Sequence, residues 1–259
     1  AWSIGVAGSP APSQPMDAIG LVQQAAAYGV HLVQIADNLP LDALPEPALE
    51  ALISEAVRLG VRIEVGTRGI QHDHLLRYLE LAKRCQSSIL RVVVDSRDHH
   101  PEPDEIVKRL RSLLPAFESA GIRLAIENHD RFKVRQLVEI LYALDSPAVG
   151  ICLDTVNSFG ALEDPARVIA ELGPHVVNLH IKDFHVRRLD HQMGFMVEGR
   201  PAGQGMLDVP ALLERLQGRS FNAILELWPA PDANADATAA KEDAWVRESI
   251  SYLRQFIPT

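Results

Sequence analysis

Short apolar runs rich in β-branched residues alternate with longer amphipathic segments along the whole chain, and this alternation constrains the fold more than any other feature. The apolar runs predict eight strands, at residues 2–7, 31–37, 62–67, 89–95, 123–128, 149–154, 176–183 and 222–229. The amphipathic segments predict helices at residues 16–28, 46–59, 72–85, 103–119, 134–144, 165–172, 209–216 and 239–256. Eight successive strand–helix units without a linker are typical of an α/β fold of the (β/α)8 TIM-barrel class.

An open, doubly wound sheet is the rival fold for such an alternation. That fold usually carries a GxGxxG turn after its first strand, and the spacing of Gly5 and Gly8 does not fit this motif. The chain has 259 residues, the usual size of one barrel, so we expect a single domain spanning residues 1–259. Its longest loop is expected at about residues 184–205, after the seventh strand. Loops of that length are usually functional or disordered.

Composition and charge exclude several protein classes. With 47% hydrophobic residues the chain can build a large core, and no apolar run approaches the roughly 18–20 residues that a membrane span needs. The formal net charge of −9, without a cluster of basic residues, disfavours a nucleic-acid partner. Cys85 and Cys152 form no CxxC pair, so neither a disulfide framework nor a cysteine zinc site is expected. We expect a cytoplasmic protein that acts on a small molecule, and a homo-oligomer is compatible with the sequence.

Ionisable residues are expected to converge inside the barrel. Barrel strands alternate their side chains between the interior and the helix layer, and all strands present their C-terminal ends at the mouth that holds the active site. This alternation turns four residues inward near that mouth: Glu127, Asp154, His180 and Glu226. Three carboxylates in a space of low dielectric constant repel one another and need a compensating cation. Together with an imidazole they form an oxygen-rich site for one divalent metal ion; we expect Mn²⁺, with Mg²⁺, Co²⁺ or Zn²⁺ as alternatives.

Motifs in the second half of the chain resemble those of a known superfamily. They are Glu127-Asn128-His129, Cys152 to Ser158, Leu179 to Asp183, Gly203-Gln204-Gly205 and Leu225-Glu226-Leu227. In this order they resemble the xylose isomerase-like TIM barrels, a superfamily of sugar phosphate isomerases and epimerases that also includes endonuclease IV. The resemblance implies that Glu127 and Glu226 are both metal ligands and acid–base catalysts. It implies that Asp154 and His180 complete the ligand set.

The chain departs from the superfamily pattern at Asn157. Many relatives have a histidine there, which contacts the substrate. An asparagine can still donate a hydrogen bond to a hydroxyl group, but it cannot take up a proton at neutral pH. We therefore expect Asn157 to bind the substrate without acting as a base.

Further substrate contacts are expected from basic residues at and after the seventh strand. They are Lys182, His185, Arg187, Arg188 and Arg200. Arginines beside a metal site suit the capture of a carboxylate or a phosphate, so these residues are expected to bind an anionic end of the substrate. Alternatively, these basic residues form a solvated surface loop that does not bind the substrate.

Three further residues have two possible roles. Glu64 and Gln34 are expected either to bind substrate hydroxyl groups or to pair with other polar groups inside the barrel. Trp228 is expected either to line the substrate pocket or to pack against neighbouring apolar side chains.

The functional hypothesis is a divalent-metal-dependent isomerase or epimerase. It would act on a small keto-sugar or sugar acid, expected to be anionic, through a metal-stabilised enediolate. The alternative is a lyase that uses the same metal site, such as a 3-oxo-isoapionate decarboxylase or a dehydroshikimate dehydratase. The basic loop and Asn157 favour this alternative, because decarboxylation needs a site for an anion and fewer proton transfers. An endonuclease IV-type nuclease is disfavoured because it needs further histidines on earlier strands, and a sugar-binding barrel without catalysis is disfavoured because the ligand set is intact.

Overall fold

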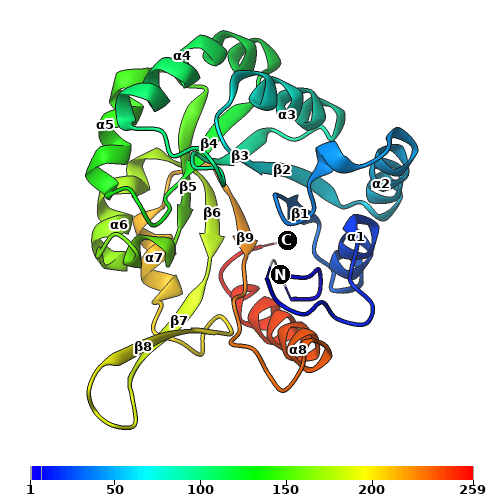
Figure 1. Cartoon of the computed structure of the whole chain (residues 1–259), viewed down its shortest axis with the longest axis vertical. Helices are drawn as coiled ribbons and strands as arrows, with labels where there is room; N and C mark the ends of the chain where they lie inside the picture. Colours follow the sequence, from blue (N-terminus) through cyan, green and yellow to red (C-terminus); the bar gives the residue numbers. More distant parts are fainter. Residues whose placement is uncertain (1, 7, 259) are drawn as a thin grey trace.

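A parallel sheet surrounded by helices forms the body of the molecule (Figure 1). The computed structural model describes residues 2–6 and 8–258. Its sheet has the strand order β1-β2-β3-β4-β5-β6-β9, with every neighbouring pair parallel. The strands are β1 (Leu32–Ile35), β2 (Arg62–Arg68), β3 (Ile89–Val93), β4 (Arg123–Glu127), β5 (Val149–Asp154), β6 (Val176–Ile181) and β9 (Asn222–Leu225). This is a single-domain α/β fold of the TIM-barrel type.

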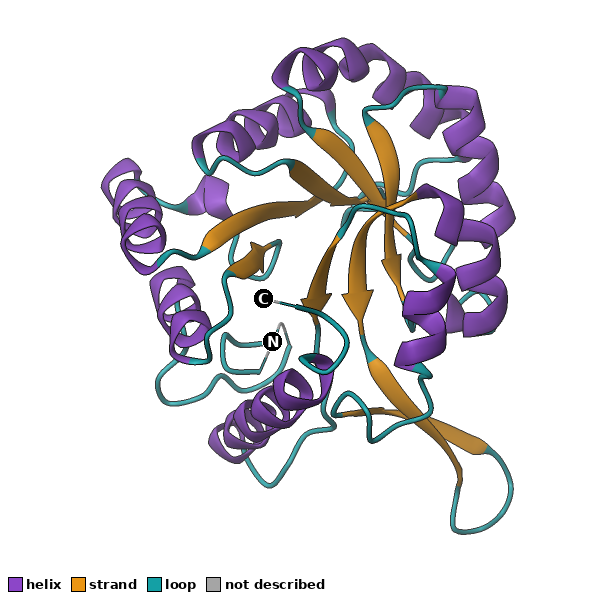
Figure 2. Ribbon diagram, turned by 180° about the vertical axis from the view of Figure 1, so that it is seen from behind, coloured by secondary structure: helices purple, strands orange, loops and turns teal. Residues whose placement is uncertain are grey.

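Helices cover the outer face of the sheet (Figure 2). They are α1 (Ala18–Ala27), α2 (Glu46–Leu59), α3 (His72–Arg84), α4 (Pro103–Ala120), α5 (Val134–Leu144), α6 (Pro165–Leu172), α7 (Val209–Arg215) and α8 (Ala235–Leu253), with short 3-10 turns η1 (Leu41–Ala43), η2 (Asn157–Phe159) and η3 (Gly173–His175). The carboxylates of Asp17 and Asp164 cap the N-termini of α1 and α6, and Gly60 ends α2 in the left-handed conformation at a φ of 66°. No described helix combines the length and apolar character that crossing a membrane requires.

The prediction of a first strand at residues 2–7 is wrong, because residues 2–6 form no strand in the structure. Residues 2–4 form a turn, and Ala7 lies outside the described residues. Gly5 has a φ of 114°, which breaks an extended strand, and the backbone N–H of Ser3 donates to Glu242 Oε2 at 2.9 Å instead of to a neighbouring strand. The described sheet therefore has seven strands where the sequence predicts eight, and β1 and β9 are its edges.

The predicted loop at residues 184–205 is largely an ordered hairpin, which corrects the sequence interpretation. Strands β7 (Asp183–Arg188) and β8 (Phe195–Arg200) pair antiparallel and project from the body (Figure 1). The Asp183 carboxylate anchors the chain that returns from the hairpin, because it accepts backbone hydrogen bonds from Gly203 at 2.9 Å and from Gly205 and Leu207 at 3.0 Å. A Cβ atom at Gly205 would lie 2.1 Å from Asp183 Oδ1, so this position requires glycine. The Gly203-Gln204-Gly205 motif thus closes the base of the hairpin.

Candidate active site

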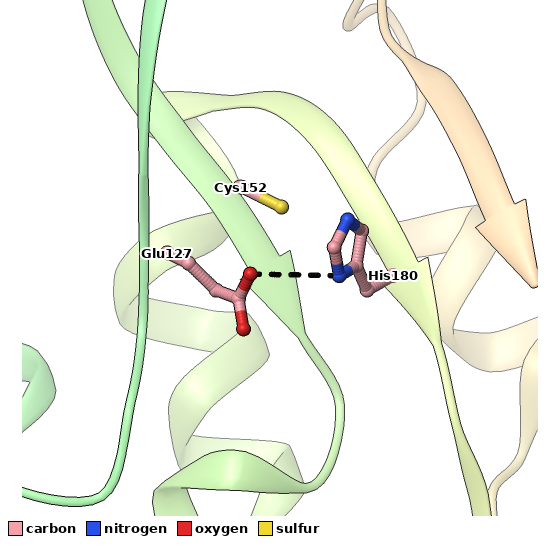
Figure 3. Close-up of side chains that lie close together, drawn as sticks. All are labelled: Glu127, Cys152 and His180. Atoms are coloured by element: carbon pink, nitrogen blue, oxygen red, sulfur yellow. Dashed lines mark ion pairs between the residues drawn. The ribbon is translucent and has the colours of Figure 1, made fainter. Parts of the chain in front are cut away.

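The four predicted metal ligands converge at the mouth of the barrel. Glu127 and Asp154 end β4 and β5, His180 lies in β6, and Glu226 directly follows β9. His180 Nδ1 lies 3.6 Å from Glu127 Oε2, 3.9 Å from Asp154 Oδ2 and 2.9 Å from Glu226 Oε2. Figure 3 shows the imidazole facing the Glu127 carboxylate. Three strands and the residue that follows a fourth therefore place their side chains around one point.

Ion pairs within the cluster engage its ligand atoms. Asp154 Oδ1 accepts the backbone N–H groups of Val156 and Asn157, both at 2.8 Å, whereas Oδ2 faces the Lys182 ammonium group at 2.9 Å. His180 Nε2 lies 2.8 Å from Gln34 Oε1, so this nitrogen carries a proton and donates to the amide oxygen. His180 Nδ1 is then the nitrogen that can coordinate an ion. The donor atoms thus fit a divalent metal ion.

Two groups of residues offer ligand atoms that lie within 4.8 Å of one another: Asp154, His180 and Glu226, and Glu127, Cys152 and His180. The sequence interpretation missed Cys152, because its strand is otherwise apolar. Its thiol donates to Asn178 Oδ1 at 3.3 Å, and burial raises the pKa of Cys152 well above its ordinary value. A neutral thiol is a poor metal ligand, so the set stays rich in oxygen. These residues form a candidate buried metal-binding site.

Two buried side-chain cations lie among the carboxylates. Lys182 Nζ lies 2.9 Å from both Asp154 Oδ2 and Glu226 Oε1. Arg91, inside β3, forms an ion pair with Glu127, and its Nη1 lies 3.3 Å from Asp37 Oδ1. The sequence analysis did not single out Arg91, although a lone arginine in an apolar run is a signal for a buried partner. The carboxylates are therefore partly compensated by the protein itself, which the sequence argument for a metal had not considered.

These cations set the ionisation of the cluster. Burial alone raises the pKa of each carboxyl group, but the Arg91 guanidinium holds the pKa of Glu127 below its ordinary value. Lys182 likewise holds the pKa of Glu226 well below its ordinary value against the effect of burial. Burial prevails at Asp154, whose pKa is raised. Glu127 and Glu226 are therefore anionic and weak as bases.

A cavity of about 370 Å³ opens above this cluster. The residues that line it include Arg68, Arg91, Glu127, His129, Asn157, His180, Lys182 and Glu226, and Ser3, Ile4 and Met16 contribute another part of its wall. Asn157 Nδ2 donates to Glu127 Oε1 at 2.8 Å, and Asn157 Oδ1 accepts from Lys182 Nζ at 3.2 Å. Asn157 thus lines the cavity, and its contact with a substrate stays a prediction. The volume suits a small polar metabolite.

Glu64 lies in the interior of the barrel and not among the residues that line this cavity. Its carboxylate accepts hydrogen bonds from Asn178 Nδ2 at 2.9 Å, Asn222 Nδ2 at 2.6 Å and Gln34 Nε2 at 3.1 Å. This is the internal pairing that the sequence left open for Glu64 and Gln34. Substrate binding by Glu64 stays a prediction.

The basic residues after His180 divide between the cavity and the hairpin. Lys182 reaches the cavity, whereas His185, Arg187, Arg188, Arg200 and Trp228 are not among its described lining residues. Arg187 Nε and Arg200 Nη2 bind Glu198 at 3.1 and 2.9 Å, and Arg188 stacks 4.6 Å above the Phe195 ring. Trp228 Nε1 donates to the carbonyl of Asp183 at 3.3 Å, at the base of the hairpin. Substrate binding by these hairpin residues therefore stays a prediction from the sequence.

Comparison with known proteins places this barrel in a family. Residues 22–256 match the family described as Xylose isomerase-like TIM barrel. The chain belongs to this family. The superfamily resemblance predicted from the sequence motifs is thereby confirmed.

Relatives within and around the xylose isomerase-like TIM barrels differ in their chemistry. The chain is 40% identical to the 3-oxo-isoapionate decarboxylase of Pectobacterium atrosepticum over 241 residues, which cover 92% of this chain and 88% of that protein. The D-psicose 3-epimerase of Clostridium cellulolyticum H10 superposes with a TM-score of 0.72 at 13% identity, covering 93% of each chain. A family member from Mycobacterium smegmatis, solved with magnesium, gives a TM-score of 0.63 at 16% identity, covering 90% of this chain and 88% of that one. The two structural similarities establish the fold alone.

Gln34 is expected to control metal affinity in this xylose isomerase-like barrel. Partners that fix the tautomer of a ligating histidine typically contribute about 10–100-fold to metal affinity, so Gln34→Leu should weaken Mn²⁺ binding by that factor. Titration calorimetry on metal-stripped protein measures the change. The matched control is Gln23→Leu, because Gln23 is exposed on α1 and bonds to Glu55 at 2.8 Å. Equal Mn²⁺ affinity in both variants would show that Gln34 does not orient His180.

Proposed function

We propose that this barrel is a metal-dependent lyase that removes CO2 from a 3-oxo sugar acid. The observation that carries the proposal is the 40% identity, over 92% of the chain, with the 3-oxo-isoapionate decarboxylase. The site supports it, because the cationic side chains of Arg68, Arg91 and Lys182 line the cavity that would hold an anionic substrate. The isomerase or epimerase expected first from the sequence becomes the second candidate.

The residues of the site can be assigned to the steps of a decarboxylation. The bond between the carboxyl carbon and its neighbour breaks, CO2 leaves, and the electron pair moves into the 3-oxo group to give an enolate. A divalent ion held by Glu127, Asp154, His180 and Glu226 would supply a Lewis acid that polarises this oxo group. Lys182 Nζ, held at 2.9 Å from Asp154 and Glu226, adds a fixed positive charge close to the negative charge that develops. A proton returned to the carbon that lost CO2 completes the ketone product.

The epimerase alternative rests on Glu127 and Glu226. They approach His180 from β4 and from the end of β9, and two carboxylates on opposite faces of a substrate can remove a proton and return one. In this chain, however, Arg91 and Lys182 hold the pKa values of both carboxyl groups below their ordinary range, which weakens them as bases. Decarboxylation needs no base to start it. The lyase is therefore the candidate that does not depend on these carboxylates acting as bases.

The two chemistries are separated by NMR in D2O with Mn²⁺-loaded protein. A lyase is expected to convert a 3-oxo sugar acid to a ketone with one carbon fewer, with deuterium at the carbon that lost CO2. Deuterium incorporation into a ketose or sugar acid that keeps all its carbons would identify an isomerase or epimerase and contradict the proposal.

Glu226→Gln provides a second test. Glu226 faces the cavity with 39% of its side chain exposed. At saturating Mn²⁺ the variant should keep substantial decarboxylase turnover, because no base is needed. A fall of about 10²–10⁴-fold, the usual worth of a positioned acid or base, would instead indicate proton abstraction by Glu226.

A further inference from the structure

The side chains of Arg68, Arg91 and Lys182 are cations that line the cavity, and two of them are already engaged. Lys182 has three N–H donors, and three acceptors surround its Nζ: Asp154 and Glu226 at 2.9 Å and Asn157 at 3.2 Å. Arg91 is buried between Glu127 and Asp37. Both side chains are therefore occupied by protein acceptors and are not available to bind the anionic group of a substrate.

Arg68 is the third cation, and its guanidinium is free to bind. It ends β2, on the inward-facing alternation that includes Glu64 and Gly66, and 38% of its side chain is exposed. Its one ion pair within the described part of the chain is a loose one, with Nη1 3.9 Å from Asp37 Oδ2. The planar guanidinium offers paired donors that match a carboxylate.

Arg68 is linked to the candidate metal site through charged contacts. Glu127 pairs with Arg91, Arg91 with Asp37, and Asp37 with Arg68. All four residues line the cavity. A substrate bound in this cavity therefore lies beside both the proposed metal ligands and Arg68.

The arginines of the hairpin are engaged elsewhere in this conformation. Arg187 and Arg200 share Glu198, and Arg188 stacks on Phe195. Unlike these arginines, Arg68 is among the described residues that line the cavity and can contact an anionic substrate there.

We propose that Arg68 is the residue that recognises the substrate carboxylate, and so selects sugar acids over neutral sugars. This rests on the proposed function, since a decarboxylase must bind the carboxylate that it removes. Because this contact ends when CO2 leaves, Arg68 contributes to substrate binding more than to the chemical step. Neutralising Arg68 should therefore raise KM and change kcat far less.

The test uses the Mn²⁺-loaded protein and two unreactive five-carbon probes, the carboxylate ribonate and the uncharged polyol ribitol. Wild type should bind ribonate more tightly, and Arg68→Met should lose about 10–100-fold in ribonate affinity, the usual worth of a charge-assisted hydrogen bond. Its affinity for ribitol should not change. Arg135→Met is the matched control, because Arg135 is 78% exposed on α5 and pairs with Glu139. It should leave both affinities unchanged.

Three results would overturn the assignment to Arg68. They are equal binding of ribonate and ribitol by wild type, undiminished ribonate affinity in Arg68→Met, and a loss of ribonate affinity in Arg188→Met without one in Arg68→Met. Failure of the proposed function is a separate result, since the protein would then release no CO2 from 3-oxo acids, whatever the probes show. A rise in KM for a reacting 3-oxo acid in Arg68→Met, with kcat retained, would support both proposals together.

Discussion

His180→Ala and Asp154→Asn are expected to abolish specific metal binding. The first removes and the second neutralises one of four donor groups. The atoms concerned, His180 Nδ1 and Asp154 Oδ2, lie 2.9 Å from Glu226 and Lys182 at the centre of the cluster. The loss of Mn²⁺ affinity should therefore exceed the roughly 10–100-fold that the loss of an outer partner causes. Turnover should disappear with the metal. Titration calorimetry and metal analysis after gel filtration measure both stoichiometry and affinity.

Two kinds of variant control for damage to the fold: a substitution of an exposed histidine, and an isosteric substitution within the site. His72→Ala is the matched histidine variant, because 55% of the His72 side chain is exposed on α3 and its partner is Asp73. It should bind one Mn²⁺ as wild type does. Asp154→Asn keeps an oxygen that can accept the backbone N–H groups of Val156 and Asn157. Because Lys182 loses one of its two carboxylate partners, the thermal unfolding of this variant should fall below that of wild type, and metal binding is therefore measured at a temperature where the variant is folded. One tightly bound Mn²⁺ per chain in His180→Ala would remove His180 from the ligand set.

Glu127→Gln is expected to lower both the stability and the activity. Its carboxylate forms an ion pair with Arg91, and both side chains are buried. Removing one partner of a buried ion pair leaves an uncompensated charge and typically lowers the free energy of unfolding by about 3–5 kcal/mol. Turnover should fall as well, because Glu127 is a proposed metal ligand. Denaturant unfolding of the metal-stripped protein measures the stability without a contribution from the ion.

The double variant Glu127→Gln/Arg91→Met tests the cause of this loss. It removes the unpaired guanidinium, so part of the stability lost in Glu127→Gln should return, whereas metal binding should not. A double variant as unstable as the sum of its single variants would show that the ion pair does not explain the effect.

The positions of the proposed ligands could be predicted from the sequence because they depend on local alternation. Glu127, Asp154 and His180 follow the period of two in strands whose burial pattern is nearly continuous, and their parallel register brings the strand ends together. The hydrogen bond between the side chains of Gln34 in β1 and His180 in β6 could not be predicted from the sequence, because those strands are not neighbours in the sheet.

Two errors in the predicted fold have physical causes. The segment before Ala7 has the composition of a strand. The positive φ of Gly5 and the backbone hydrogen bond from Ser3 to Glu242 direct it away from the sheet. Neither feature can be read from a pattern of apolar residues. The segment after Asp183 contains many polar residues and no NG or DG turn signal, so it was predicted to be a loop, although Val186 and Val197 pair across a hairpin. The first segment is held by hydrogen bonds to a residue far along the chain, and the second by pairing between the two strands of the hairpin.

The most direct test of the central claim is CO2 release from a 3-oxo sugar acid during titration of metal-stripped protein with Mn²⁺. Spontaneous decarboxylation is subtracted with a blank that holds substrate and Mn²⁺ without protein. We expect no release above this blank without metal, a rise with added Mn²⁺, and a plateau at one equivalent per chain, with no rise in His180→Ala. Full release from the metal-free protein, or no release at any Mn²⁺ concentration, would contradict the account.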